Sequence, residues 1–276
     1  MRAKKSLGQN FLVDGGVVGR IVDELGPRAD ETVVEIGPGR GALTREIVGR
    51  AGRLVVVEYD RELAAFLGGQ FGGREDFTLI EADALEVDFC AAVRPASRAR
   101  VGANLPYNIS TAILQRLIEQ RGCLTEMLLM LQREVVERIT APPGSSARGF
   151  LSVLVEMYCE AEALFDVAPG SFRPVPKVWS TVARVRLRER AAVHVPDEGS
   201  FRRLVSAGFA QRRKTILNNL RSAPEPLRAG VEAAGGAARA LEAARVEAGA
   251  RAETLALEEW ARLANALSAG APPVGG

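Results

Sequence analysis

The sequence of 276 residues contains little histidine and little cysteine. A single histidine, His194, cannot build a multi-histidine metal site and offers little to a Ser-His or Cys-His nucleophile. The three cysteines, Cys90, Cys123 and Cys159, are widely separated and form no C-x-x-C pair, which argues against a disulfide framework and a zinc site. We therefore expect buried free thiols and no bound metal.

The sequence also lacks a long apolar run. The basic stretch "MRAKKSLGQNFLVD" has no continuous apolar core of the signal-peptide kind, and no segment is long enough to cross a bilayer. With 47% apolar residues and a mean hydropathy of +0.03, the chain can bury one full core and a smaller second one. We expect a cytoplasmic monomer without membrane contact, because no stretch reads as a long apolar interface.

Strand-like and helix-like runs alternate through the first two thirds of the chain. The strand-like runs, rich in Val, Ile and Leu, are "TVVEIG", "RLVVVEYD", "FTLIEAD", "RVGANLP" and "EMLLMLQ". The helix-like runs are "GALTREIVGR", "RELAAFLGGQ", "TAILQRLIEQ" and "REVVERIT". Near-continuous apolar strands separated by helices indicate a parallel sheet covered on both faces. The pattern predicts an α/β fold with a Rossmann-like, doubly wound sheet.

The remaining sequence predicts two late strands and a helical region. A Pro-, Gly- and Ser-rich loop at residues 141–150 precedes the helix-like "LSVLVEMY", and the strand-like "CEAEALFDV" and "STVARVRLRER" follow. After about Pro196 the sequence becomes rich in Ala, Arg and Glu, with a helical texture. We predict a domain at residues 1–195, a small α-helical domain at 196–268 and a disordered tail at 269–276.

Charge is balanced overall but unevenly distributed. The formal net charge is +2, yet residues 201–221 carry six Arg or Lys and no acid, including Arg212, Arg213 and Lys214. Such a segment is typical of a polyanion-binding surface. A second row of arginines falls on one face of the last strand by its two-residue period: Arg184, Arg186, Arg188 and Arg190. For this row we favour a solvated face over an RNA-facing one.

The stretch "VVEIGPGRGAL" joins the first strand of the predicted sheet to a helix. It places Glu35 at the strand end and Gly37, Gly39 and Gly41 in the turn. Glycine there permits tight backbone geometry and close approach of a ligand to the helix N-terminus, which predicts a nucleotide-type cofactor. The alternative is that the glycines only make a tight turn and that the acids are solvated strand ends.

Acidic residues near three strand ends favour one cofactor. Glu58 ends the second strand about twenty residues beyond the first glycine, where a carboxylate typically accepts both ribose hydroxyls. Asp83, at the end of the third strand, can accept from an adenine amine. Glu35 suits an ammonium group or, through water, a cationic ligand. Together these acids favour S-adenosylmethionine over a nicotinamide cofactor.

The stretch "NLPY" follows the fourth strand, at the carboxyl edge of the sheet beside the glycine loop. The Asn104 side-chain carbonyl and the Leu105 backbone carbonyl can each accept one hydrogen of a planar exocyclic amine, and Pro106 fixes the turn. Two such acceptors favour the pyramidal amine that attacks a sulfonium methyl group. Tyr107 can stack on a flipped base, and Phe172 in "PGSFRPVPKVWS" is the candidate for its opposite face. For both Tyr107 and Phe172, the alternative to stacking on a base is ordinary packing within the protein.

These motifs resemble those of the ribosomal RNA adenine dimethyltransferases, in particular the bacterial family that modifies two adjacent adenosines near the 3′ end of 16S rRNA. The resemblance covers nearly the whole chain, through "KKSLGQNFLVD", "EIGPGRGALT", "VEYD", "EADAL", "NLPYNIS", "FRPVPKV", "FAQRRKTILNNL" and "RAETLALEEW". It implies a class I methyltransferase sheet, S-adenosylmethionine as cofactor, the small ribosomal subunit as substrate and a role in its biogenesis.

The resemblance also implies residue roles. Asn10 and Leu12 would border the cofactor from the N-terminal segment. Beside them, the implied cofactor-binding residues are Gly37, Glu58, Asp83 and Asn104. The "NLPY" loop would be catalytic, Phe172 would clamp the target base, and a basic helix around residues 212–214 would contact the rRNA backbone.

Two positions depart from the family pattern. The loop before "LSVL" often carries a Tyr-Gly pair in the family, and here it reads Arg148-Gly149. An acidic residue is usual after "PKV", and here Trp179 stands. Both departures concern the docking of RNA rather than the chemistry.

Three other functions remain open from the sequence. A large-subunit rRNA adenine methyltransferase of the macrolide-resistance type shares the fold and the cofactor logic, although "SLGQNFL", Leu105 and "RRKT" favour the small-subunit enzyme. A non-catalytic RNA-binding assembly factor would not need the intact acids and "NLPY". A DNA adenine methyltransferase would more often begin its loop with Asp and carry a larger recognition domain.

Overall fold

The computed structural model describes residues 3–4 and 7–269, which form two compact units. The first unit comprises Met1–Glu137 and Cys159–Glu189, and the second comprises Arg138–Tyr158 and Arg190–Gly276. This grouping differs from the predicted boundary at residue 195, because residues 138–158 pack with the later helices. The predicted disordered tail lies outside the described residues, apart from Ala269 at the end of the last helix.

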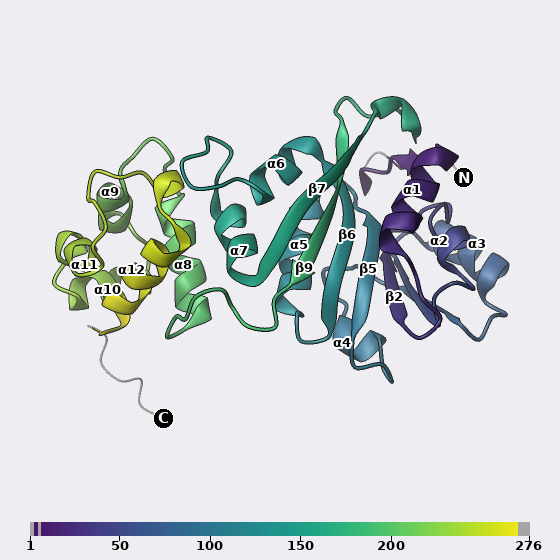
Figure 1. Ribbon diagram of the computed structural model, residues 1–276, viewed down its shortest axis with the longest axis horizontal. Coiled ribbons are helices and arrows are strands. Elements are labelled where there is room, and N and C mark those ends of the chain that lie inside the picture. Colours follow the sequence, from purple (N-terminus) through teal and green to yellow (C-terminus); the bar gives the residue numbers. More distant parts are fainter. Residues whose placement is uncertain (1–2, 5–6, 270–276) are drawn as a thin grey trace. The chain divides into compact units, whose positions relative to one another are not determined.

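A seven-stranded sheet forms the core of the first unit (Figure 1). In spatial order its strands are β4 (Phe77–Glu81), β3 (Arg53–Glu58), β2 (Thr32–Ile36), β5 (Ala99–Asn104), β6 (Leu124–Gln132), β9 (Ser180–Leu187) and β7 (Cys159–Val167). The first five are parallel, and β9 lies antiparallel to β6 and β7. The predicted α/β fold is confirmed, and the carboxyl ends of β2 to β5 share one edge of the sheet.

Helices accompany these strands along the chain. They are α1 (Gly15–Leu25), α2 (Thr44–Ile47), α3 (Arg61–Phe71), α4 (Phe89–Ala92), α5 (Ser110–Glu119) and α6 (Arg133–Ile139). The apolar stripe of α1 packs on the sheet, where Val22 and Leu25 join a buried cluster with Val33 and Val56. Asp14 starts α1 by accepting backbone N–H groups of its first turn, as is usual for an N-cap.

A two-stranded ladder lies apart from the main sheet. It pairs β1 (Phe11–Leu12) with β8 (Phe172–Arg173) in antiparallel register, so that Leu12 faces Phe172 and Phe11 faces Arg173. Strands of two residues show no periodicity, and the sequence analysis did not predict them. The ladder ties the N-terminal segment to the loop that precedes β9.

The arginine row on β9 is neutralised rather than simply solvated. Arg184 forms ion pairs with Glu24, Glu126 and Glu162, and Arg186 pairs with Glu126 and Glu162. Two of these acids lie on the neighbouring strands β6 and β7, in register with the arginines. Because Arg184 and Arg186 have close acidic partners, their part of the face offers little attraction to a polyanion.

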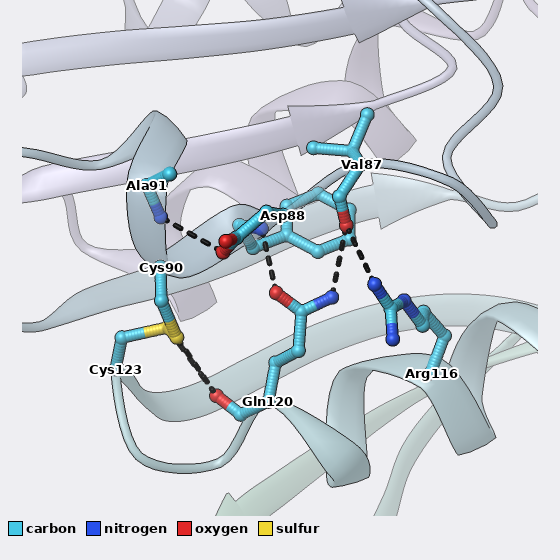
Figure 2. Close-up of a disulfide and its surroundings, with 8 residues drawn as sticks. Val87, Asp88, Cys90, Ala91, Arg116, Gln120 and Cys123 are labelled. Atoms are coloured by element: carbon cyan, nitrogen blue, oxygen red, sulfur yellow. Dashed lines mark hydrogen bonds between the residues drawn. A yellow bond between two sulfur atoms is a disulfide. The ribbon is translucent and has the colours of Figure 1, made fainter.

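The expectation of free thiols is wrong for two of the three cysteines. Cys90 on α4 and Cys123, just before β6, form a disulfide (Figure 2). The Gln120 side chain also joins the two segments, since its Nε2 donates to the Val87 carbonyl at 2.9 Å. The folding of α4 against the end of α5 brings together cysteines 33 residues apart, and a separation of that size carries no local signal. Cys159 is free and buried, and burial raises the pKa of its thiol to about 12.

The second unit is mainly helical. Its helices besides the end of α6 are α7 (Phe150–Tyr158), α8 (Glu198–Gly208), α9 (Ile216–Arg221), α10 (Leu227–Ala233), α11 (Ala237–Ala243) and α12 (Leu257–Ala269). Trp260 is completely buried at its centre and stacks on Phe209, with 5.8 Å between ring centroids. Across residues 3–4 and 7–269, each helix is too short or too polar to pass through a bilayer.

The packing of α8 on Trp260 requires a glycine. A Cβ at Gly208 would lie 2.9 Å from Trp260 Cζ3 and closer still to a neighbouring ring atom. We expect Gly208→Ala to destabilise the chain by about 1–3 kcal/mol despite the better helix propensity of alanine. Denaturant unfolding measures this change. Gly230→Ala in α10 is the control, because its Cβ would meet only ordinary contacts; equal effects of both substitutions would contradict the packing argument.

Candidate functional site

A pocket opens at the edge of the sheet where β2, β3 and β5 end. Of the predicted site residues, its lining includes Asn10, Leu12, Glu35, Gly37, Gly39, Glu58, Asp83, Asn104, Leu105, Pro106 and Tyr107. The lining does not include Gly41 or Phe172. Within the described part of the chain, no group of three or more His, Cys, Asp or Glu side chains is arranged to hold a metal ion. The fold therefore brings together side chains from segments nearly a hundred residues apart, as parallel strands with a shared carboxyl edge require.

The glycine loop is shaped by backbone conformation and by close contact. Gly37 and Gly39 take left-handed conformations with φ of +63° and +59°, which favour glycine. A Cβ at Gly39 would also lie 2.9 Å from the ring of Phe11, so glycine lets the N-terminal segment close over the loop. Gly41 serves the turn instead, since its N–H donates to the Pro38 carbonyl at 2.9 Å.

Glu58 at the end of β3 is the central acceptor of the pocket. Its Oε2 accepts the Gly39 N–H at 3.1 Å, and its Oε1 accepts the Asp60 N–H at 2.8 Å. Burial raises the pKa of Glu58, and these two hydrogen bonds oppose that shift. Each carboxylate oxygen retains a lone pair for a further donor, such as a hydroxyl group.

Glu35 at the end of β2 is fully buried. Thr44 Oγ1 donates to its Oε2 at 2.7 Å. Burial raises the pKa of Glu35 to about 8, the Thr44 hydrogen bonds oppose that shift, and the nearby Glu58 charge adds to it. A buried carboxyl group with so few partners is suited to a cationic ligand, which would favour its charged form.

Asp83 and Tyr59 complete the far side of the pocket. Asp83 lies two residues beyond β4, and its Oδ1 accepts the Leu85 N–H at 2.9 Å. Tyr59 directly follows Glu58 and is 60% exposed. Tyr59 was not among the predicted site residues, although an aromatic residue beside a strand-end acid was the available signal. An exposed ring at a pocket wall is suited to a flat ligand.

The N-terminal segment is tethered to the pocket by polar contacts that the sequence analysis did not predict. Lys4 Nζ lies 2.8 Å from Asp60 Oδ1, and Gln9 Nε2 donates to Asp60 Oδ2 at 3.0 Å. Burial raises the pKa of Asp60, but the bonds from Lys4 and Gln9 outweigh it and hold that pKa below its ordinary value. With the β1–β8 ladder, these contacts place Asn10 and Leu12 at the pocket.

Asn104 is oriented by the N-terminal segment. Its Nδ2 donates to the Asn10 carbonyl at 3.2 Å, which leaves Oδ1 as the acceptor that the amide can offer a ligand. Leu105 is buried and anchors the loop. The Tyr107 hydroxyl lies 2.6 Å from Ser180 Oγ, and burial raises the pKa of Tyr107 against the effect of this bond. The loop is thus held on both sides of Pro106.

Phe172 does not lie where a base clamp would need it. Its side chain is 0% exposed and belongs to the apolar cluster under α1. Pairing with Leu12 in the β1–β8 ladder explains this burial. The structure therefore matches the packing alternative for Phe172, and it leaves the ring without a face toward the pocket.

The basic residues of the second unit lie in a turn, not on the predicted helix. Arg212, Arg213 and Lys214 are exposed between the end of α8 and the start of α9. Arg212 also donates to the Ser146 carbonyl at 2.6 Å. Thr215 caps α9 by accepting the Asn218 N–H, and this cap fixes the helix start just after the basic turn.

Arg148 has an internal role. Its guanidinium is buried and donates to the carbonyls of Ala141 and Leu255, at 3.0 and 3.3 Å, and to the carboxylate of Glu156 at 2.6 Å. Arg148 therefore contributes to the packing of the helical unit. Its cation is enclosed within that unit.

Comparison with known proteins identifies the family. The family described as "Ribosomal RNA adenine dimethylase" has a sequence model that matches residues 1–268. The chain belongs to this family. It is 44% identical over 263 residues to "Ribosomal RNA small subunit methyltransferase A" of Xanthomonas oryzae pv. oryzae (strain PXO99A), which covers 95% of both chains. It is also 44% identical to the protein of the same name from Hahella chejuensis, over 80% of this chain and 81% of that relative.

Solved structures agree with this assignment. The 23S rRNA methyltransferase ErmE is 29% identical with a TM-score of 0.68, over 94% of this chain and all of that one (100%). A dimethyladenosine transferase from Plasmodium falciparum shares the fold, with 22% identity and a TM-score of 0.75 over 94% and 98% of the two chains. The predicted methyltransferase fold and the predicted family are confirmed.

The buried Glu35 makes stability depend on pH. Because its pKa is about 8 in the folded protein and 4.5 is its ordinary value, the folded state alone keeps this proton between these values. Its contribution to stability is lost as pH rises through that window. We therefore expect the free energy of unfolding of Glu35→Gln to rise relative to that of the unsubstituted chain as pH increases. The difference should grow by on the order of 1 kcal/mol per pH unit and level off above about pH 8.

Urea unfolding without ligand at several pH values between 5 and 9 measures this difference. Glu75→Gln is the matched control, since Glu75 is exposed in the same unit. A difference between Glu35→Gln and the unsubstituted chain that stays constant with pH would show that Glu35 is ionised in the folded protein.

Proposed function

We propose that the chain uses S-adenosylmethionine to dimethylate the exocyclic amines of two adjacent adenosines near the 3′ end of 16S rRNA, in the small ribosomal subunit or its precursor. The observation that carries this proposal is the oriented Asn104 carboxamide at the acid-lined glycine pocket. The names of the two relatives at 44% identity support the choice of the small subunit.

The pocket residues fit this cofactor. Glu58 has lone pairs left for both ribose hydroxyls after it accepts Gly39 and Asp60. Asp83 suits the adenine amine, and the exposed ring of Tyr59 suits the adenine face. Glu35 suits the ammonium group of the amino-acid end. When bound, the cofactor supplies an electrophilic methyl group on a sulfonium sulfur.

Asn104 and Leu105 act on the amine that receives the methyl group. The bond from Asn104 Nδ2 to the Asn10 carbonyl turns Oδ1 to the ligand side, and Pro106 offers no N–H that would compete for the Leu105 carbonyl. Two neutral acceptors draw the amine hydrogens out of the base plane and favour a localised lone pair. They therefore stabilise the transition state more than the ground state, and the released proton passes to solvent.

Tyr107 holds the target base in this proposal. Its hydroxyl is anchored on Ser180, so the ring is fixed beside Asn104 and offers a stacking face to an adenine that has left its helix. Phe172 supports the same site from the core, by pairing with Leu12 in the β1–β8 ladder, and does not stack on the base.

The helical part of the chain contributes binding of the RNA backbone. Exposed cations at residues 212–214 suit phosphate groups, which provide salt-dependent affinity and little reading of bases. In this proposal residues 1–195 are the methyltransferase domain and residues 196–268 are the rRNA-binding domain.

Methylation of large-subunit rRNA is the second candidate. It is favoured by the similarity to ErmE, at 29% identity over 94% of this chain. Both candidates use the same pocket, so only the RNA substrate distinguishes them.

We expect Asn104→Ala to lower kcat for methyl transfer by about 100-fold or more, because one of two transition-state acceptors is lost. Affinity for S-adenosylmethionine should change far less. Labelled methyl transfer to small subunits from cells that lack the modification measures this, with Asn265→Ala on the exposed face of α12 as the control.

Purified large subunits form the second arm of the same assay. Dimethyladenosine confined to small-subunit RNA is the expected result. Transfer to large subunits alone would replace the proposal by the second candidate, and an Asn104→Ala variant of unchanged kcat would remove the role given to that side chain.

We expect the double substitution Arg213→Ala and Lys214→Ala to weaken subunit binding and to reduce the slope of log affinity against log salt by roughly 1 to 2. The kcat at saturating subunits should stay within about twofold, since neither residue lies at the pocket. Binding titrations at several salt concentrations measure the slope. An unchanged slope would show that these cations do not contact phosphate.

A further inference from the structure

The loop between β8 and β9 presents an unusual amount of apolar surface. In the described ranges, the exposed large apolar side chains are Val13, Tyr59, Val175, Val178 and Trp179. Three of the five, Val175, Val178 and Trp179, lie in the single loop of residues 174–179. Trp179 is the largest and is 47% exposed, although its loop lies close to the buried Phe172. Apolar side chains gathered at one exposed place mark a binding surface more often than scattered ones do.

Trp179 is held in place by its backbone and by a cation. Its carbonyl accepts the Arg133 N–H at 3.0 Å, and the Arg133 guanidinium lies 4.9 Å from the ring centroid. Asp166 pairs with Arg133 at 2.6 Å and so fixes that guanidinium. The indole is therefore a positioned ring, with a cation against it and nearly half of its surface open.

This ring adjoins the catalytic loop. Trp179 immediately precedes Ser180, and Ser180 Oγ lies 2.6 Å from the Tyr107 hydroxyl. Ser180 is also in register with Gln132 at the carboxyl end of β6, the sheet edge on which the pocket opens. If one base stacks on Tyr107, a nucleotide only a short way along the same RNA strand can therefore reach Trp179.

The charge around Trp179 suits a polyanion. Residues 167–187 contain no acid, and Arg173 at the end of β8 and Lys177 in the loop are exposed. Farther along, Arg184 is already paired with acids of neighbouring elements. Arg173 Nη1 donates to the Gly170 and Phe172 carbonyls, at 3.0 and 2.7 Å, which fixes its exposed guanidinium beside the loop. This place thus combines exposed cations with an exposed aromatic ring, which is the combination that binds single-stranded nucleic acid.

We propose that Trp179 stacks on an unpaired base that flanks the target adenosine in the rRNA, while Arg173 and Lys177 contact the adjoining phosphates. This inference rests on the proposed function and adds a second base-binding place to it. Single-stranded RNA is recognised in this manner because its bases can be splayed onto aromatic side chains.

Methyl transfer by the full-length protein to unmodified small subunits tests the proposal. Trp179→Ala should raise KM for subunits about tenfold, as expected for one lost stacking contact. The kcat and the affinity for S-adenosylmethionine should stay within about twofold. Trp179→Phe should recover most of the loss, because it keeps a ring. A lost stacking contact should leave the salt slope of binding unchanged, whereas Lys177→Ala should reduce it.

Tryptophan fluorescence provides a readout that does not depend on catalysis. The other tryptophan, Trp260, is completely buried, so quenching by a single-stranded RNA oligonucleotide of ten residues reports on Trp179. We expect quenching in the unsubstituted chain and none in Trp179→Phe. Thermal unfolding of each variant checks that the exposed substitutions leave the fold intact.

The possible outcomes distinguish failure of the proposed Trp179 stacking from failure of the proposed methyltransferase function. Active unsubstituted protein with an unchanged KM in Trp179→Ala would overturn the inference and leave the proposed function standing. Absence of transfer to either ribosomal subunit would overturn the proposed function, and the fluorescence arm would still decide whether Trp179 binds RNA. A raised KM without quenching by RNA would indicate a ribosomal protein as the partner and would also overturn the inference.

Discussion

The hydrogen bond from the Gly39 N–H to the buried Glu58 carboxylate is the contact on which the geometry of the pocket depends. It joins the glycine loop after β2 to the end of β3. Glycine is needed at position 39 because the Phe11 ring fills the space that a side chain would take. The N-terminal segment can then lie across the loop, and its Asn10 carbonyl reaches the Asn104 amide. A backbone conformation in one loop thereby orients a side chain in another.

The first unit contains two different arrangements of charged side chains, one on the face of β9 and one at the pocket. On the β9 face, arginines meet acids of adjacent strands and their charges are satisfied within the protein. At the pocket, Glu35 and Glu58 are buried with few partners, and burial raises the pKa of both. A buried acid that lacks a cation costs stability until a ligand supplies the charge. Glu35 and Glu58 accept hydrogen bonds but form no ion pair among the described residues, so they mark the place where a ligand binds. The paired arginines mark a face that needs no ligand.

Several predictions from the sequence failed for one physical reason, namely that burial and partners depend on contacts distant in sequence. Phe172 has the motif of a base clamp, but its pairing with Leu12 places it in the core. Cys90 and Cys123 lack any spacing signal, but the approach of α4 to the end of α5 joins them. Arg148 stands in a loop sequence that carries no sign of burial, yet three partners hold it inside the helical unit.

The sequence by itself determined the order of the seven main-sheet strands, the glycine loop, the strand-end acids Glu35 and Glu58, and the "NLPY" loop, because periodicity and turn chemistry are local properties. The parallel connections then placed those strand ends at one edge. Only the tertiary structure decided which side chains face the pocket, which acids stay unpaired and which aromatic ring remains open to solvent. Those outcomes depend on the packing of the β1–β8 ladder and on neighbours far along the chain, and no window of sequence contains both partners of such a contact.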